Sequence, residues 1–287
     1  ASITTIPGAI EDIILSNDKR GMTRLRDCLS LDYCMAAAEF LYNRLGPTII
    51  VTGFYELGPR VIETDGPPGA LSIGRALNSL SQNVVYVSDY HGTPFLINEI
   101  RDNQLVEFPI VGHEESEEFA SAVIEKYKPS VIISIERCGP NSNGQYLNWR
   151  GIDISRYTAR IDQLLSKHLP SVGIGDGGNE IGMGNLASII PSMPSLNISP
   201  CVTCSTNLII SSVSNWGGYG LVAAMSVRKG RNLLPSVASE QELLKTAVKA
   251  GAVDGMSRKN ECKVDGFTMQ ENSQVVAELR NYIAGEG

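Results

Sequence analysis

Acidic residues set among glycines are the groups in this sequence best suited to chemistry. The densest example runs from Gly173 to Gly184, where six of the twelve residues are glycine and Asp176, Asn179 and Glu180 lie between them. Carboxylates can move protons, and glycines let backbone N–H groups approach a ligand closely. The segment predicts a loop around a small polar substrate, or around a cation held by oxygen ligands. Simple turn formation is the alternative.

A carboxylate and a glycine also precede a predicted helix. Residues 63–70 have the sequence ETDGPPGA, in which Asp65 and Gly66 come directly before two prolines. Proline fixes the backbone for a first helical turn, and free N–H groups at a helix start attract anions. The segment predicts an anion-binding turn with a carboxylate beside it. A turn capped by Asp65 is the alternative.

An acid and a base follow the apolar run at residues 131–135. Glu136 can take or give a proton, and Arg137 can hold a carboxylate through two parallel hydrogen bonds. Neighbours on a strand point to opposite faces, so the two side chains diverge if the strand continues through them. One of the two could then be only a structural charge.

Other motifs, present or missing, indicate which ligands and enzyme classes fit the sequence. Asn207 lies at the start of a predicted strand and could orient an amide or a carboxylate, although a helix cap is equally consistent with its position. Gly173, Gly175 and Gly178 have GxGxxG spacing, but the acid expected about 20 residues later for a ribose is missing, which disfavours a dinucleotide site. The sequence also lacks a GxSxG motif and a Walker-type phosphate loop.

The elements that must position these residues alternate along the chain. Short, continuously apolar runs are typical of strands buried in a parallel sheet, and amphipathic segments between them predict helices. We expect an α/β fold: an open, mostly parallel sheet with helices on both faces, in three α/β/α layers. We expect residues 1–30 to form an N-terminal arm and residues 31–287 a single domain. The predicted strands are 48–52, 84–87, 105–111, 131–135, 171–174 and 206–212, and the longer predicted helices include 155–169, 219–227 and 270–283.

Composition limits the partners. The 287 residues carry a net charge of −7 without a cluster of Lys or Arg, so nucleic acid and anionic membranes are not expected partners. The six cysteines are too few for a disulfide framework in a chain of this length. Glycine is in excess, at 28 residues. A small-molecule substrate fits this composition best, and the oligomeric state stays open.

Four of these segments together resemble the D-glutamate cyclase C-terminal domain family. They are ETDGPPGA (63–70), ISIERCGPN (133–141), GDGGNEIGMGN (175–185) and SNWGGYGL (214–221). The resemblance implies conversion of D-glutamate to 5-oxo-D-proline and water, a location in the mitochondrial matrix, and an N-terminal domain of the same protein as a partner. It implies no firm cofactor, and a divalent cation stays open.

The chemistry of this reaction assigns roles to the residues above. The α-amine must lose a proton, the oxyanion needs N–H donors, and one oxygen must leave as water. We expect Asp176 or Glu136 as the base and Glu180 or Asp65 as the acid. The expected substrate-binding residues are Gly66, Gly177 and Gly178 as oxyanion donors, Arg137 as the α-carboxylate clamp, and Asn179 and Asn207.

Two other functions compete with this one. A ligand- or cation-binding regulatory domain, with catalysis in another domain, would use the same glycine loops. A phosphoryl-transferring enzyme with a magnesium site at Asp65 and Asp176 is a third hypothesis, weakened by the missing phosphate loop.

Overall fold

Six parallel strands form the centre of the fold. A computed structural model describes residues 5–101, 103–167, 169–196 and 199–285 of the chain. The strands lie in the order β5-β4-β1-β6-β7-β8, and each neighbouring pair is parallel. Their bounds are β1 Thr48–Val51, β4 Val84–Ser88, β5 Gln104–Glu107, β6 Val131–Ile135, β7 Ser171–Gly175 and β8 Asn207–Ile210. The predicted α/β class is confirmed.

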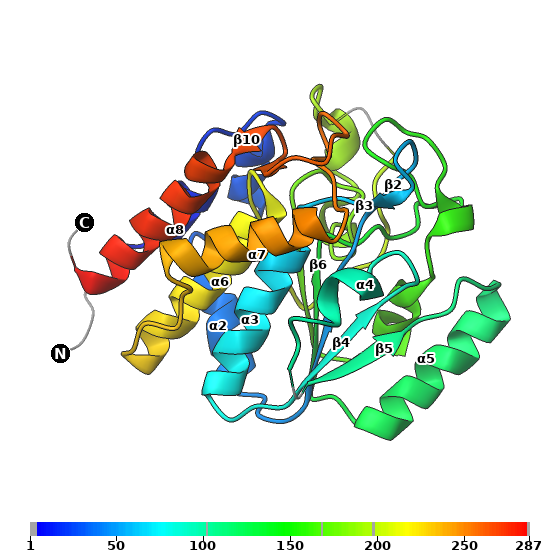
Figure 1. Cartoon of the computed structure of the whole chain (residues 1–287), viewed down its shortest axis with the longest axis horizontal. Coiled ribbons are helices and arrows are strands. Elements are labelled where there is room, and N and C mark those ends of the chain that lie inside the picture. The colour runs from blue at the N-terminus through cyan, green and yellow to red at the C-terminus, as the bar shows by residue number, and fades with distance from the viewer. Residues whose placement is uncertain (1–4, 102, 168, 197–198, 286–287) are drawn as a thin grey trace.

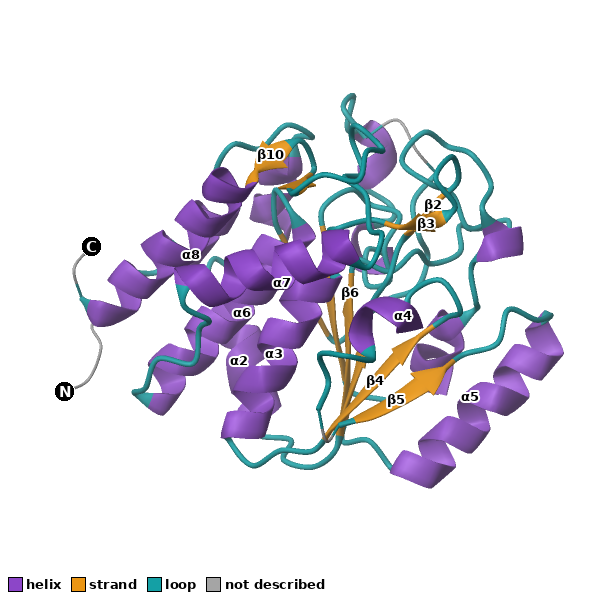
Figure 2. Cartoon of the chain, in the orientation of Figure 1, coloured by secondary structure: helices purple, strands orange, loops and turns teal. Residues whose placement is uncertain are grey.

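Helices cover both faces of this sheet (Figures 1 and 2). Alternate residues of β1 point to opposite faces, so Ile50 joins one apolar core while Ile49 and Val51 join the other. The first core contains residues of α2 (Tyr33–Tyr42), α3 (Pro67–Ser79) and α6 (Ser214–Lys229). The second contains residues of α5 (His113–Tyr127) and of the 3₁₀ helix Ile161–Lys167. The three layers follow from this alternation.

Shorter elements surround the sheet. The remaining α-helices are α1 Ala9–Ile14, α4 Thr93–Leu96, α7 Val237–Lys249 and α8 Met269–Ala284, with α7 and α8 on the outside of α6 in Figure 1. Two small hairpins pair β2 Tyr55–Glu56 with β3 Val61–Ile62, and β9 Lys263–Val264 with β10 Phe267–Thr268. The other 3₁₀ helices are Met22–Cys28, Ser155–Tyr157, Gly184–Leu186 and Ile190–Ser192.

The direction of the strand order reverses between β1 and β6. From β1 the chain moves outward to β4 and β5, and then returns to the other side of β1 as β6, β7 and β8. Loops leave the carboxyl ends of β1 and β6 in opposite directions at such a reversal, and open α/β sheets bind ligands there. Among the described residues, no helix has the length and apolar character needed to cross a bilayer.

Two segments differ from the sequence expectation. The segment 155–169, of which residue 168 lies outside the described residues, forms two 3₁₀ helices instead of one α-helix. Between them, the Ala159 N–H and carbonyl bond to Asp89 and Arg137, so they are not available to a continuous helix. Helix α6 begins at Ser214, five residues before the predicted start.

The first 30 residues contribute to the main core. Ile10, Ile14, Met22 and Leu25 are buried there, although we expected this segment to be a lead-in arm. The Ser212 backbone N–H also donates to the Ile14 carbonyl at 2.9 Å. The described part of this segment is therefore fixed against the sheet and can place side chains at its edge.

Candidate functional site

Six buried carboxylates gather at the carboxyl ends of the strands. Asp65 lies between the β2–β3 hairpin and α3, Glu136 follows β6 directly, and Asp176 follows β7 directly. They form three overlapping groups of three residues, and within each group the carboxylate oxygens lie within 4.8 Å of one another. We call this set the carboxylate cluster: Glu63, Asp65, Glu136, Asp176, Glu180 and Asp265. The four residues expected to act as acids and bases are all in it.

Asp65 binds the amino-terminal end of α6. Its two oxygens accept the backbone N–H groups of Ser214 at 3.0 Å and of Asn215 at 2.7 Å. Asp176 also accepts the Ser214 N–H, at 3.2 Å. The first N–H groups of a helix have no partner within the helix and carry partial positive charge, so they stabilise both carboxylates. This shared donor brings the loops after β1 and β7 together.

The turn before α3 leaves no space for a side chain beside Glu136. A Cβ atom at Gly66, where φ is +110°, would lie 2.6 Å from Thr52 Oγ1 and 3.0 Å from Glu136 Cβ. The Gly66 N–H donates to the side-chain oxygen of Asn215 at 2.8 Å, so it does not point a free donor at a ligand. Glu136 has a φ of +45°, a conformation that non-glycine residues adopt mainly where the surrounding structure imposes it.

The glycine loop after β7 folds around its own acid. Glu180 accepts the Asp176 N–H at 2.9 Å and the Gly178 N–H at 2.7 Å, one with each carboxylate oxygen. The Gly178 N–H is therefore engaged within the loop, while Gly177 lines a cavity. Asn179 is buried, and its side-chain amide donates to the Leu147 carbonyl at 3.0 Å. In the described structure, the short 3₁₀ helix Gly184–Leu186 follows this loop. A dinucleotide site has an α-helix at this position, so the GxGxxG spacing does not form one here.

Glu63, Asp265 and Arg20 were not predicted as site residues, although Glu63 lies in the ETDGPPGA segment. Arg20, in the turn after α1, forms an ion pair with Asp176 and lies 3.6 Å from Asp265 Oδ2. Asp265 lies in the turn between β9 and β10 with a φ of +51°. No motif or spacing in the sequence links these residues to Asp176. Their positions depend on how α1 and the β9–β10 hairpin pack against the sheet.

A cavity of about 260 Å³ opens beside the cluster. Arg20, Lys19 and Asp265 provide its charged lining, and Gly177 and Ser212 provide polar lining. Apolar side chains, including Trp149 and Phe267, form other parts of its wall. Both signs of charge and an apolar wall occur together, as a small zwitterionic ligand requires.

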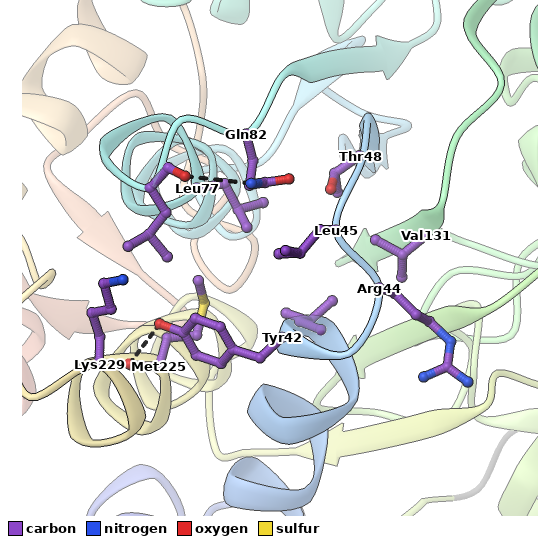
Figure 3. Close-up of a pocket in the computed structure, with 11 residues that line it drawn as sticks. Tyr42, Arg44, Leu45, Thr48, Leu77, Gln82, Val131, Met225 and Lys229 are labelled. Carbon is purple, nitrogen blue, oxygen red and sulfur yellow. Dashed lines mark hydrogen bonds between the residues drawn. The ribbon is translucent and has the colours of Figure 1, made fainter.

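A second cavity, of about 210 Å³, lies at the opposite end of the strands. Figure 3 shows that Thr48 and Val131, the first residues of β1 and β6, line it with Leu77, Tyr42 and Met225. The Tyr42 hydroxyl donates to the Met225 carbonyl at 2.9 Å. Its described lining contains no carboxylate. The candidate residues for chemistry therefore lie at the carboxyl end of the sheet.

Arg137 and Asn207 do not join the cluster. The Arg137 guanidinium pairs with Asp89 at 2.6 Å and donates to the carbonyls of Gly53 and Ala159. Glu136 instead accepts a hydrogen bond from the Ser214 hydroxyl, so the two neighbours contact different parts of the fold. Asn207 is the first residue of β8 and pairs with Val172, toward the amino end of the sheet.

Burial controls the protonation of the cluster. It raises the pKa of Asp65 to about 7, and the nearby Asp265 carboxylate adds to this rise. Burial also raises the pKa of Glu136 well above its usual range, with Glu180 the next cause. It raises the pKa of Asp176 as well, although Arg20 opposes this effect. Carboxyls that are neutral near physiological pH can donate protons, and such shifts are typical of functional sites.

The cluster also has donors suited to a metal ion. The three groups with close ligand atoms are Glu63, Asp65 and Glu136; Asp65, Asp176 and Asp265; and Glu136, Asp176 and Glu180. All their ligand atoms are carboxylate oxygens, which suit hard divalent cations such as Mg²⁺ or Mn²⁺.

Comparisons with solved structures give weak matches. A crystal structure of Acinetobacter baumannii MurG covers 59% of this chain and 46% of its own, with 9% identity and a TM-score of 0.31. An actinorhodin polyketide ketoreductase with NADPH covers 66% of each chain, with 16% identity and a TM-score of 0.29. Similarities at this level carry no argument about function.

Sequence comparisons are more informative. The human protein "D-glutamate cyclase, mitochondrial" is 29% identical over an alignment of 246 residues, which covers 71% of this chain and 40% of the relative. The chain therefore spans two fifths of the length of this relative. The family model "D-glutamate cyclase-like, C-terminal" matches residues 10–280, a range that includes every member of the carboxylate cluster and Arg20. The chain belongs to the D-glutamate cyclase-like C-terminal family.

Proposed function

We propose that this chain converts D-glutamate to 5-oxo-D-proline and water. The observation that carries the proposal is the carboxylate cluster beside a cavity that also contains Arg20, in a chain of this family. The human relative is named as a D-glutamate cyclase. Cyclisation needs groups that accept and donate protons close to one small molecule, and the cluster provides several of them.

The cavity lining can orient the substrate. Arg20 and Lys19 are its cations and would bind the two carboxylates of D-glutamate, while Asp265 would bind the α-ammonium group. Arg20 replaces Arg137 in this proposal because Arg20 lines the cavity, whereas the buried Arg137 guanidinium binds Asp89 and two carbonyls away from it. Binding both ends of the substrate brings its amine close to the γ-carboxyl carbon, which lowers the entropic barrier to ring closure.

The proton transfers balance within the cluster. The α-ammonium gives one proton to Asp176 or Glu136, and its nitrogen then attacks the γ-carboxyl carbon. The C–N bond forms, the nitrogen loses a second proton, and one γ-oxygen accepts two protons and leaves as water. We favour Asp65 as the proton donor because burial raises its pKa to about 7, so it holds a proton near neutral pH. The Gly177 N–H is our oxyanion donor, since those of Gly66 and Gly178 are engaged.

Turnover by the purified chain tests the proposal. D-Glutamate should yield 5-oxo-D-proline, and Asp176→Asn should lower kcat by about 10²- to 10⁴-fold. Glu240→Gln is the matched control, because Glu240 is a buried acid on α7 that bonds to Tyr219 outside the cluster. D-Glutamate binding without turnover would contradict the proposal and favour the regulatory-domain hypothesis. Equal turnover by Asp176→Asn and wild type would contradict the assignment of the site.

Two properties of the human relative extend the proposal. Its name places that protein in mitochondria, and we propose the same location for this chain. The matched region covers 40% of the relative, so we also propose that a further domain accompanies this one. Adding the relative's remaining domain as a separate polypeptide should change turnover if the two domains cooperate.

A further inference from the structure

Ser212 is a polar residue of the cavity to which the proposed reaction gives no role. It lies in the loop between β8 and α6, is 7% exposed, and lines the cavity together with Arg20 and Gly177. Its hydroxyl oxygen is buried and has no hydrogen-bond partner among the described residues. A buried polar group without a partner is unfavourable. The Ser212 hydroxyl is therefore suited to bond to a ligand in the cavity.

The preceding serine is held differently. The Ser211 hydroxyl is buried and donates to the Val213 carbonyl at 2.7 Å, on the side that faces α6. A Cβ atom at Gly217 of α6 would lie 2.7 Å from this hydroxyl oxygen. In the described part of the chain, no such bond fixes the Ser212 hydroxyl in one staggered position. Rotation about its Cα–Cβ bond can therefore turn it toward a ligand.

Backbone hydrogen bonds on both sides of Ser212 hold it near the groups that would transfer protons. The Ser211 N–H donates to the Gly175 carbonyl at 3.2 Å, which joins the loops after β7 and β8. The Ser214 N–H donates to Asp176, the candidate base, at 3.2 Å. Ser212 lies between these two donors in the chain, so its position relative to the loop after β7 is fixed.

The lining of the cavity has an exposed part and a buried part. Trp149 and Met256 are 40% and 43% exposed, and Lys19 is also exposed. Gly177 and Ser212 are buried. The two donors that the cavity offers beside the candidate base therefore lie in its buried part, away from bulk water.

We propose that the Ser212 hydroxyl donates a hydrogen bond to the γ-carboxyl group of the substrate. The inference rests on the proposed function, which supplies the ligand. The γ-carboxyl group is the one that reacts, so it must lie near the base and the Gly177 N–H. Negative charge grows on a γ-oxygen as the nitrogen attacks, and a fixed donor in a buried site stabilises that charge. Ser212 would then be a second oxyanion donor beside Gly177.

Glutarate separates this contact from the reaction. It has both carboxylates of glutamate but no amine, so it cannot cyclise. In calorimetric titrations, Ser212→Ala should bind glutarate about tenfold more weakly than wild type, because the hydrogen bond to a carboxylate is lost. Ser211→Ala is the matched control and should bind glutarate as wild type does, since its hydroxyl bonds within the fold. Equal affinities of Ser212→Ala and wild type, or no glutarate binding by wild type, would overturn the inference.

Thermal unfolding separates a ligand contact from a structural role. Ser212→Ala removes a hydroxyl without a partner, so its Tm should equal or exceed that of wild type. Ser211→Ala breaks the bond to the Val213 carbonyl and should lower the Tm by about 2–4 °C. An equal fall in both variants would show that the Ser212 hydroxyl supports the fold, which would overturn the inference.

Turnover tests the oxyanion role. Ser212→Ala should lower kcat for D-glutamate about 10²-fold, whereas Ser211→Ala should keep the kcat of wild type. Weaker glutarate binding by Ser212→Ala, with no turnover of D-glutamate by wild type, supports the contact and contradicts the proposed function. Turnover by wild type, with the same kcat and glutarate affinity in Ser212→Ala, overturns the contact and leaves the proposed function in place.

Discussion

Arg20→Met should show how strongly the carboxylate cluster depends on the positive charge of Arg20. The substitution removes the partner of Asp176, whose side chain is 2% exposed, while the Arg20 side chain is 24% exposed. Removing one member of a fully buried pair costs about 3–5 kcal/mol, and the partial exposure of Arg20 reduces this to about 2–3 kcal/mol. The loss should appear in the free energy of unfolding at about pH 8.

The loss should shrink as the pH falls. Burial already raises the pKa of Asp176, and Arg20 opposes that rise, so the variant carboxyl has a still higher pKa and takes up a proton sooner. Protonation removes the uncompensated charge, so the loss should fall to about 1 kcal/mol at about pH 5. Urea unfolding in EDTA, followed by circular dichroism, measures both values without a divalent cation in place of the lost charge.

A surface pair provides the control. Arg75 lies 2.8 Å from Glu99 and its side chain is 39% exposed, so Arg75→Met should cost about 0–1 kcal/mol at either pH. The reasoning is refuted if Arg20→Met costs no more than Arg75→Met, or if its cost is the same at both pH values.

Three further substitutions test the fold around the site. Glu240→Gln should stabilise the chain by about 2–3 kcal/mol at about pH 8 but not at about pH 4. Burial raises the Glu240 pKa from 4.5 to about 7, so the ionised form that exists at pH 8 is unfavourable in the folded chain. Equal urea midpoints for variant and wild type at pH 8 would contradict this prediction. Gly218→Ala should lower stability by about 1–3 kcal/mol, because the new Cβ would lie 3.2 Å from the Gly69 Cα where α6 crosses α3. Gly112→Ala is the control, because its Cβ would meet no atom within 4 Å and should not destabilise the chain. Thermal unfolding compares the two variants. Arg137→Met should cost about 3–5 kcal/mol by leaving Asp89 buried without its partner, and a melting temperature like that of wild type would contradict the structural role of this pair.

The sequence was sufficient to predict the sheet and the end of it that carries the acids. The apolar runs at 48–52, 84–87 and 131–135 correspond to β1, β4 and β6. Because parallel strands place their carboxyl ends at one edge, residues that follow different strands meet there. Asp65 and Asp176 are 111 positions apart by their numbers, yet both accept the Ser214 N–H.

Long-range packing determined what the sequence could not predict. Arg20 is 156 residues from Asp176, and no local pattern connects them. The glycines after Ser214 have low helix propensity, which favours a later start for α6, but they allow α6 to approach α3 closely. The segment 155–169 has a helical pattern, but the buried Arg137 and Asp89 side chains bond to the Ala159 backbone. In each case a tertiary contact overrides local preference.

The fate of the γ-carboxyl oxygens shows directly whether this chain cyclises D-glutamate. The purified chain would be supplied with D-glutamate carrying ¹⁸O at both γ-oxygens, and mass spectrometry would follow the product. The account predicts 5-oxo-D-proline with one labelled oxygen in the lactam carbonyl, the other label in water, and loss of this product in Asp176→Asn. No labelled 5-oxo-D-proline from the wild-type chain, or equal amounts from wild type and Asp176→Asn, would contradict it.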